Sequence, residues 1–449
     1  MRSLIKICAR LGAVAIRAGR TTSALMLAIG FLNLAIGLLT TVLLAQLLPR
    51  AGYGEYVLAL SVASIAALPV ELGLPTLMMR EIARFRAEDK NELIAAIIAW
   101  VLAFVSCSFV FIAVAFLVYY ITVRSEKVSE CLQILSMLLL LPLALMNWAR
   151  GILQGFDKPV QFALPDSIFR PVLLLIFVGL LVVAGALSPM MVMAAHVTAV
   201  SLCFWWSISR AAKILRSSGV RWRFNRSDLR AREWLASLLP ITLVSGVRVV
   251  NRRIDIVIVG ALSSTATVAV YNVSLQITSV VLVAQTILNQ SLGPKVAMAH
   301  HKGNTEQLRR EIAASSIISA SAAVIFSATI ILGGKWAIPR IFGEDYAHSY
   351  SLVCILCLGQ LFSALMGPTA LLLNMSRLEG KTLRTGILSA IVGISLAALL
   401  VPPLHGVGAA IAASATLVAI QAQRWWMVKE HIGVRCDIFS AVSFLFHRT

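Results

Sequence analysis

The chain has 449 residues, of which 59% are hydrophobic and 13% are charged, and its formal net charge is +19. Soluble domains carry roughly 25% charged residues, so this chain has too few charges to cover a water-facing surface, and most of its surface must face lipid. The positive charge does not indicate nucleic acid as a partner, because the basic residues lie in short stretches between apolar runs rather than in one patch on a polar domain.

The chain begins with a basic segment, 1–22, whose apolar core, LGAVAI, is short and interrupted. We therefore expect an uncleaved cytoplasmic amphipathic segment rather than a signal peptide.

Apolar stretches long enough to cross a bilayer, which takes about 20 residues, then recur about a dozen times. In the first half of the chain they lie at 23–48, 55–78, 93–120, 131–149, 160–184 and 189–209. In the second half they lie at 234–261, 268–294, 312–334, 349–374, 386–403 and 408–427. A basic segment, 210–233, separates the halves, and a tail, 428–449, follows the last span.

The positions of Lys and Arg predict the orientation of these spans. With the N-terminus inside, about 30 of the 39 basic residues fall in the expected cytoplasmic segments and about five in the outer loops. We therefore expect a multi-pass protein with both termini in the cytoplasm.

The two halves are similar to each other. GYGEYVLALSVASI at 52–65 corresponds to TVAVYNVSLQITSV at 267–280, and each half then has a charged inner loop, at 86–93 and at 301–308. Because six spans is an even number, both halves enter the membrane from the same side. This predicts an all-α protein of two six-helix lobes, 23–209 and 234–427, related as parallel repeats about an axis along the membrane normal.

The sequence shows no sign of catalysis. We find no Gly-rich phosphate loop, metal-ligand cluster or nucleophile elbow, and no expected outer loop exceeds about 15 residues, which leaves no room for a catalytic domain. The C-x-x-C of Cys354 and Cys357 lies within an apolar run, where a reactive thiolate is not expected. We therefore expect neither an enzyme nor a bound cofactor or metal.

Several stretches carry a family likeness. They are LLPRAGYGEYVLALSVASI, VELGLPTLMMREIARF, RRIDIVIVGALSSTATVAVYNVSLQI, RIFGEDYAHSYSLVCIL and PLHGVGAAIAASATLVAI. In this order and spacing, over roughly residues 20–430, the chain resembles the polysaccharide-biosynthesis flippases of the multidrug/oligosaccharidyl-lipid/polysaccharide exporter superfamily.

The resemblance implies a V-shaped, alternating-access transporter in the bacterial inner (plasma) membrane. Its implied substrate is an undecaprenyl-diphosphate-linked oligosaccharide, the repeat unit of O-antigen or exopolysaccharide, and membrane lipids and a polysaccharide polymerase are the other implied partners. A coupling ion, H⁺ or Na⁺, is also compatible with the family.

Four arginines fall within the predicted spans, and we expect them to face the interior because a charge at the bilayer centre costs roughly 2.5–3.5 kcal/mol. Arg248 and Arg252 share one helical face with Asp255, Arg253 lies about 100° round from Arg252, and Arg170 follows another acid, Asp166, by four residues. One hypothesis is that Arg170, Arg248, Arg252 and Arg253 line a cationic cavity that binds the diphosphate, since guanidinium binds phosphate oxygens bidentately. The other is that Asp166–Arg170 and Arg252–Asp255 are structural ion pairs.

Other polar residues in the spans have two interpretations each. Asp255 is either a salt-bridge partner or a site for the coupling ion, and Glu71, close after Pro69, is either a cavity carboxylate or part of a kinked helix end. Asn272 and Gln276 share a helical side that suits sugar hydroxyls, but hydrogen bonding between helices is the simpler interpretation.

Two other transporter functions stay open. A multidrug or cation exporter of the same superfamily would need an acidic, aromatic pocket, whereas arginine outnumbers acid in these spans. A peptidoglycan-precursor flippase would also need a cationic cavity, but such proteins usually carry two more C-terminal helices, and the tail 428–449 is too short for them.

Overall fold

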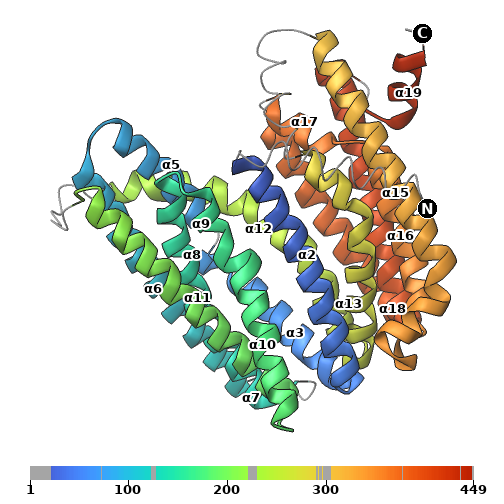
Figure 1. Cartoon of the computed structure of the whole chain (residues 1–449), viewed down its shortest axis with the longest axis horizontal. Coiled ribbons are helices and arrows are strands. Elements are labelled where there is room, and N and C mark those ends of the chain that lie inside the picture. Colours follow the sequence, from blue (N-terminus) through green and yellow to red (C-terminus); the bar gives the residue numbers. More distant parts are fainter. Residues whose placement is uncertain are drawn as a thin grey trace. The chain divides into compact units, whose positions relative to one another are not determined.

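A computed structural model of the protein describes residues 22–71, 73–122, 128–220, 230–289, 292, 296, 305–376, 378–434 and 436–446. Every regular element among these residues is a helix (Figure 1). The all-helical membrane fold expected from the sequence is therefore confirmed for the part of the chain that the structure describes.

The helices follow one another with short connections. Up to the basic segment they are α2 (Thr22–Leu47), α3 (Arg50–Ala66), α4 (Leu68–Glu71), α5 (Leu74–Ala87), α6 (Asn91–Thr122), α7 (Glu130–Leu138), α8 (Leu140–Gly155), α9 (Pro159–Leu164), a π-helical turn η1 (Pro165–Phe169), α10 (Arg170–Val183) and α11 (Pro189–Ser217). After it they are α12 (Ala231–Leu262), α13 (Thr265–Ser279), η3 (Val280–Leu282), α15 (Thr305–Phe342), η4 (Glu344–Tyr346), α16 (Ser349–Leu365), α17 (Thr369–Met375), α18 (Glu379–Ile432) and α19 (Ile438–Phe446).

Nine helical stretches of described residues are long and apolar enough to cross a membrane, or ten if the pair α16 and α17, bent by 42°, forms one span. The sequence predicts about a dozen, and two local features explain the difference. The span expected at 55–78 is divided among α3, α4 and α5, and Gly73, at φ 80°, begins α5 with a proline in its first turn. The spans expected at 386–403 and 408–427 form the single 54-residue helix α18, which is interrupted at His405 (φ 49°).

The break in α18 follows from its sequence. Pro402 and Pro403 stand inside the helix, and a proline there removes a hydrogen bond and clashes with the preceding turn. His405, which adopts the left-handed backbone conformation, accommodates the change of direction.

The described residues form two compact units. The first comprises those of Met1–Thr40, Ala66–Glu126 and Glu130–Ser245, and the second those of Thr41–Ile65, Lys127–Ser129 and Gly246–Thr449. The lobe limits expected from the sequence stay a prediction, and the structure places residues 41–65 in the second unit rather than with the rest of the first half.

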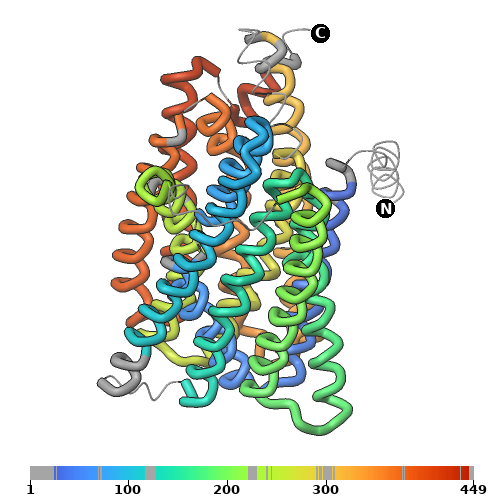
Figure 2. The backbone as a smooth tube through the Cα atoms, turned by 90° about the vertical axis from the view of Figure 1, so that its left-hand side faces the viewer, coloured from blue at the N-terminus to red at the C-terminus, as the bar shows by residue number. Residues whose placement is uncertain are grey.

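In the first unit, α8 packs against α11 and α5 (Figures 1 and 2). The close approach of α8 to α5 needs small residues, since a Cβ at Gly155 would lie 2.7 Å from Cβ of Ile82. In the second unit, α16 packs against α13, α15 and α18. Each unit thus has its own buried helix core on which charged side chains are held.

Candidate functional site

In the first unit, one carboxylate lies between two arginines. Asp166 Oδ1 is 3.0 Å from Nη2 of Arg170, and its Oδ2 is 3.4 Å from Nη1 of Arg150. The side chains of Asp166 and Arg170 are about one third exposed (35% and 33%), whereas that of Arg150 is 10% exposed. With two cations to one anion, this cluster keeps an excess positive charge.

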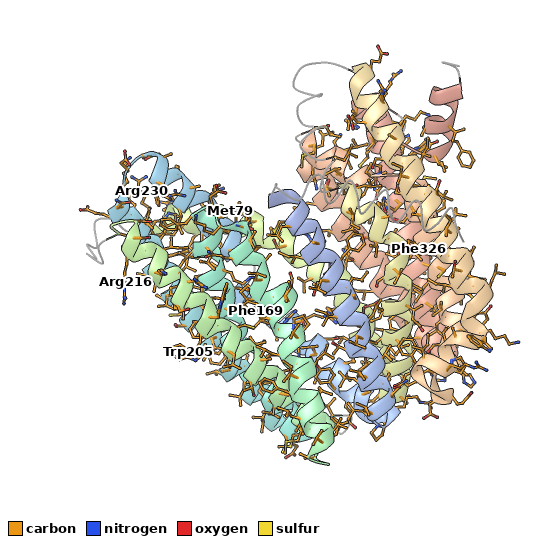
Figure 3. All side chains as sticks on the ribbon, viewed as in Figure 1. Met79, Phe169, Trp205, Arg216, Arg230 and Phe326 are labelled. Carbon is orange, nitrogen blue, oxygen red and sulfur yellow. The ribbon has the colours of Figure 1, made fainter. Side chains whose placement is uncertain are left out.

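A π-helical turn places Asp166 in this cluster. The turn η1 covers PDSIF, and the backbone N–H of Arg170 donates to the carbonyl of Pro165, five residues earlier. Such turns are rare inside helices and occur frequently at functional sites. The neighbouring helix α11 supports the turn, because Sγ of Cys203 donates to the same carbonyl at 3.4 Å. The ring of Phe169, which is labelled in Figure 3, also meets that of Trp206 edge-on, with 5.0 Å between the ring centres.

Arg150 was missed by the sequence analysis, because the predicted span 131–149 ends one residue before it. In the structure it lies in α8 and donates from Nε to the carbonyl of Phe162 (2.8 Å) and from Nη1 to Oδ1 of Asn147 (2.8 Å). Its guanidinium also lies 4.5 Å from the centre of the Phe162 ring. The signal that could have found it is its position inside the apolar run LMNWARGIL.

In the second unit, α12 carries the other three arginines. Arg248 and Arg252 are exposed, and among the described residues no carboxylate lies within 4.0 Å of either guanidinium. Arg253 is half-buried and interacts electrostatically with Asp255 and with Tyr53 of α3. The face of α12 that carries Arg248 and Arg252 therefore presents cations without an acidic partner.

Asp255 does not form the expected pair with Arg252. Its Oδ2 accepts a 2.7 Å hydrogen bond from the hydroxyl of Tyr271 in α13, and its Oδ1 accepts one from the backbone N–H of Ile256 at 2.8 Å. The sequence spacing could not show this partner, since Tyr271 belongs to the next helix.

Asn272 lies next to this bond and serves the packing of helices. It is buried, and its Nδ2 donates to the hydroxyl of Tyr53 at 2.8 Å, which agrees with the simpler of its two interpretations. Gln276, one turn further along α13, is half-buried. Glu71 ends α4, and its side chain lies outside the described part of the structure.

The spacing of four residues between Asp166 and Arg170 predicted a pair that the structure contains. The structure adds Arg150 to this pair and joins Asp255 to Tyr271 in the second unit. Chemically, the exposed guanidinium groups offer forked donors to phosphate or carboxylate oxygens.

Comparisons with known proteins identify a family and a fold. The sequence profile of the family described as "Polysaccharide biosynthesis protein" matches residues 19–300, and no curated protein matches the chain. Among solved structures, an inward-facing multidrug resistance MATE family transporter of the MOP superfamily has a TM-score of 0.72 at 15% identity, over 89% of this chain and 94% of its own.

Two further solved structures are similar. The lipid II flippase MurJ in an inward closed conformation has a TM-score of 0.70 at 13% identity, over 90% of this chain and 87% of its own. A MOP superfamily transporter from Pyrococcus furiosus, described as having a binding pocket of reverse polarity that suggests a different function, has a TM-score of 0.62 at 14% identity, over 91% of this chain and 95% of its own. At these identities the likeness shows the two-lobe transporter fold.

Proposed function

The chain belongs to the polysaccharide biosynthesis protein family, and from this premise we propose that it is a flippase for undecaprenyl-diphosphate-linked oligosaccharide. It would move the completed repeat unit of an O-antigen or exopolysaccharide from the inner to the outer leaflet of the bacterial inner membrane. A polymerase on the outer side would then take over the repeat unit.

The unpaired arginines of α12 carry this proposal. Arg248 and Arg252 lie in a helix whose apolar length is sufficient to cross a membrane, and each charge would cost roughly 2.5–3.5 kcal/mol at the bilayer centre. An anionic substrate group offsets that cost and explains why the chain keeps both. A diphosphate suits them, because guanidinium stays ionised when it leaves water and binds phosphate oxygens with two donors.

The remaining site residues have supporting roles in the proposal. Arg170 offers a further cation in the first unit, where Asp166, which Arg150 also contacts, fixes its position. Arg253, which is half-buried beside Asp255, adds a positive charge on a less exposed side of α12. Gln276 offers an amide for sugar hydroxyls, and Asn272 positions Tyr53 rather than contacting the sugar itself.

Asp255 is our candidate for coupling to an ion gradient. It is a carboxylate in an apolar helix with a neutral hydroxyl as its hydrogen-bond donor. Binding H⁺ or Na⁺ there would remove a net negative charge from the second unit, and such a change can bias a two-state transporter.

Two other functions of the same superfamily are outcomes of the test. A multidrug or cation exporter would need acidic residues where this chain has Arg248 and Arg252. A peptidoglycan lipid-precursor flippase would use the same cations on a different sugar.

The test is to delete the gene, extract the lipid-linked intermediates, and complement with wild type, Arg248→Ala or Arg252→Ala at matched abundance. Arg232→Ala is the control, because Arg232 is an exposed arginine at the start of the same helix, outside its apolar part. We expect complete undecaprenyl-diphosphate repeat units to accumulate on the cytoplasmic side, with rescue by wild type and Arg232→Ala but not by the other two variants.

Each other result has a definite meaning. Rescue by all variants would keep the flippase and remove the diphosphate role of Arg248 and Arg252. Accumulation of peptidoglycan precursors would favour that flippase instead. Intact surface polysaccharide without any accumulation would overturn the proposal in favour of small-molecule export.

A further inference from the structure

The first unit contains a small polar pocket between α5 and the start of α12. It is lined by Arg80, Glu81, Arg84, Glu233, Trp234 and Ser237, and its volume is about 180 Å³. A volume of about 10–15 Å³ on this measure holds one water molecule, so the pocket has room for a polar group of several atoms. None of these residues belongs to the arginine sites described above.

One residue that lines the pocket has a buried donor without a hydrogen-bond partner among the described residues. Trp234 is 1% exposed, and its Nε1 has no hydrogen-bond partner among the described residues. Its ring lies 5.4 Å from that of Trp100, which holds it in place. Since a buried N–H without a partner is costly, such a group indicates a ligand or water that completes it.

The charges around the pocket are mixed. Arg80 and Arg84 each contact the buried carboxylate of Glu81, at 3.1 Å and 2.7 Å, yet their side chains are 50% and 44% exposed. Each guanidinium has five N–H donors, so donors remain for a further oxygen. Glu233 is 65% exposed and lies 3.6 Å from Arg230, which Figure 3 labels in the same unit.

The pocket lies at the ends of membrane spans. The candidate spans Asn91–Phe116 and Ala231–Leu262 begin beside it, and the Lys and Arg pattern predicts that these ends are cytoplasmic. Glu88, in the turn between α5 and α6, has its pKa lowered by hydrogen bonding to Lys90 and by the charges of Lys90, Arg84 and Arg230, which locates these cations around the same end. This is the depth at which phospholipid headgroups and interfacial tryptophans are found.

We propose that this pocket binds the headgroup of a zwitterionic phospholipid, phosphatidylethanolamine, from the cytoplasmic leaflet. The phosphate accepts hydrogen bonds from Arg80, Arg84 and the indole N–H of Trp234, and the ammonium group lies by the carboxylate of Glu233. The carboxylates of Glu81 and Glu233 disfavour a diphosphate, because its negative charge is higher than that of a phospholipid phosphate. The site is therefore separate from the proposed transport site.

The experiment uses the purified full chain, stripped of lipid in detergent and titrated in native mass spectrometry. The probes are dioleoyl phosphatidylethanolamine, dioleoyl phosphatidylglycerol, soluble phosphoethanolamine and inorganic phosphate. The variants are Trp234→Phe, which keeps a six-membered aromatic ring but removes the N–H together with the five-membered ring, and Arg80→Gln. Trp205→Phe is the matched control, because Trp205 is an exposed tryptophan of α11 that does not line the pocket.

We expect wild type and Trp205→Phe to bind one phosphatidylethanolamine more tightly than phosphatidylglycerol, and to bind the two soluble probes far more weakly. Trp234→Phe and Arg80→Gln should each weaken phosphatidylethanolamine binding about tenfold, since each loses a hydrogen bond to a charged group. Gel filtration establishes that each variant is folded, and Arg80, being half exposed, provides a test that does not disturb the core.

Three results would overturn the inference. Equal phosphatidylethanolamine binding by wild type, Trp234→Phe and Arg80→Gln would remove the pocket as the site. Tighter binding of phosphatidylglycerol would contradict the zwitterionic headgroup. Soluble phosphoethanolamine or phosphate binding as tightly as the lipid would assign the pocket to a free phosphate compound.

Discussion

The hydroxyl of Tyr271 donates a 2.7 Å hydrogen bond to Oδ2 of Asp255, across the contact between α13 and α12. Because this partner is neutral, it does not cancel the carboxylate's charge, and Arg252 remains without an acidic partner among the described residues. The bond therefore separates two roles on one helix. In the proposed function, Asp255 is the candidate site for the coupling cation, and Arg252 is a candidate for binding the anionic substrate group.

Replacing Tyr271 by Phe should leave the half-buried carboxylate of Asp255 short of one hydrogen-bond donor. We expect a loss of about 1–2 kcal/mol in the free energy of unfolding, since bonds to charged groups are at the strong end of the range. Thermal unfolding in detergent measures it. If Asp255 couples an ion, the pH or Na⁺ dependence of transport should shift as well.

Tyr350→Phe is the matched control for that change. The hydroxyl of Tyr350 donates to a neutral acceptor, the carbonyl of Ile331, at 2.9 Å. Tyr350→Phe should lower the free energy of unfolding by less than Tyr271→Phe does, and it should leave the pH or Na⁺ dependence of transport unchanged. Equal effects of the two variants on both readouts would contradict a special role for Asp255.

Asp166→Asn should destabilise the first unit more than Arg170→Gln does. The first change leaves both Arg150 and Arg170 without their carboxylate, whereas the second removes only one of two cations. We expect about 1–3 kcal/mol for Asp166→Asn, below the 3–5 kcal/mol of a fully buried pair, because the side chain is 35% exposed.

A double variant and a surface control complete this test. The Asp166→Asn/Arg170→Gln variant should cost less than the sum of the two single changes, because the residues are in direct contact. Arg210→Gln, at an exposed position over Trp206, should cost no more than about 0.5 kcal/mol. If the losses in the free energy of unfolding of the two single variants add up to that of the double variant in chemical unfolding, the ion pair makes no net contribution to stability.

Gly54→Ala should impair folding, whereas Gly30→Ala should not. A Cβ at Gly54 would lie 1.7 Å from the backbone oxygen of Thr265 at the start of α13, but one at Gly30 meets nothing within 4 Å. Overpacking usually costs about 1–3 kcal/mol, and here the obstacle is backbone, so we expect the upper end or above. Abundance in the membrane and thermal unfolding measure it, and normal folding of both variants would contradict the close contact.

The attachment of α19 should weaken in acid. Burial raises the pKa of Asp437, but hydrogen bonds from the amide of Ser440, the indole of Trp425 and the hydroxyl of Ser440 outweigh it and hold the pKa below its usual range. A lowered folded-state pKa gives stability that is present above the unfolded value of about 3.9 and is lost as pH falls through the folded value.

Hydrogen exchange of the α19 amides tests this pH dependence. The bonds to Ser440 and Trp425 are 2.9 Å long and fix the start of α19. In wild type, protection should fall below about pH 4. Asp437→Asn keeps an acceptor at this capping position but not the charge, so its protection should be lower at neutral pH and nearly independent of pH. The same acid response in both proteins would assign the effect to another group.

The sequence predicted those parts of the fold and site that depend on neighbours along the chain. The apolar runs and the distribution of Lys and Arg indicated a helical, multi-pass membrane protein, and the spacing of Asp166 and Arg170 indicated their pairing on one helix. Arg150 escaped this reasoning because its carboxylate partner belongs to another helix and the charge stands near the end of its own apolar run.

The sequence by itself determined that most of the chain is surrounded by lipid and which family the chain belongs to. A chain with 13% charged residues must bury its backbone polar groups in helices within lipid, and the order of its motifs indicates the family. Only the tertiary structure decided which polar groups meet. Asp255 forms a hydrogen bond with Tyr271 rather than an ion pair with Arg252, and Asn272 forms one with Tyr53. These contacts join different helices, so they depend on how the helix faces pack, and the spacing of residues within one helix does not encode that packing.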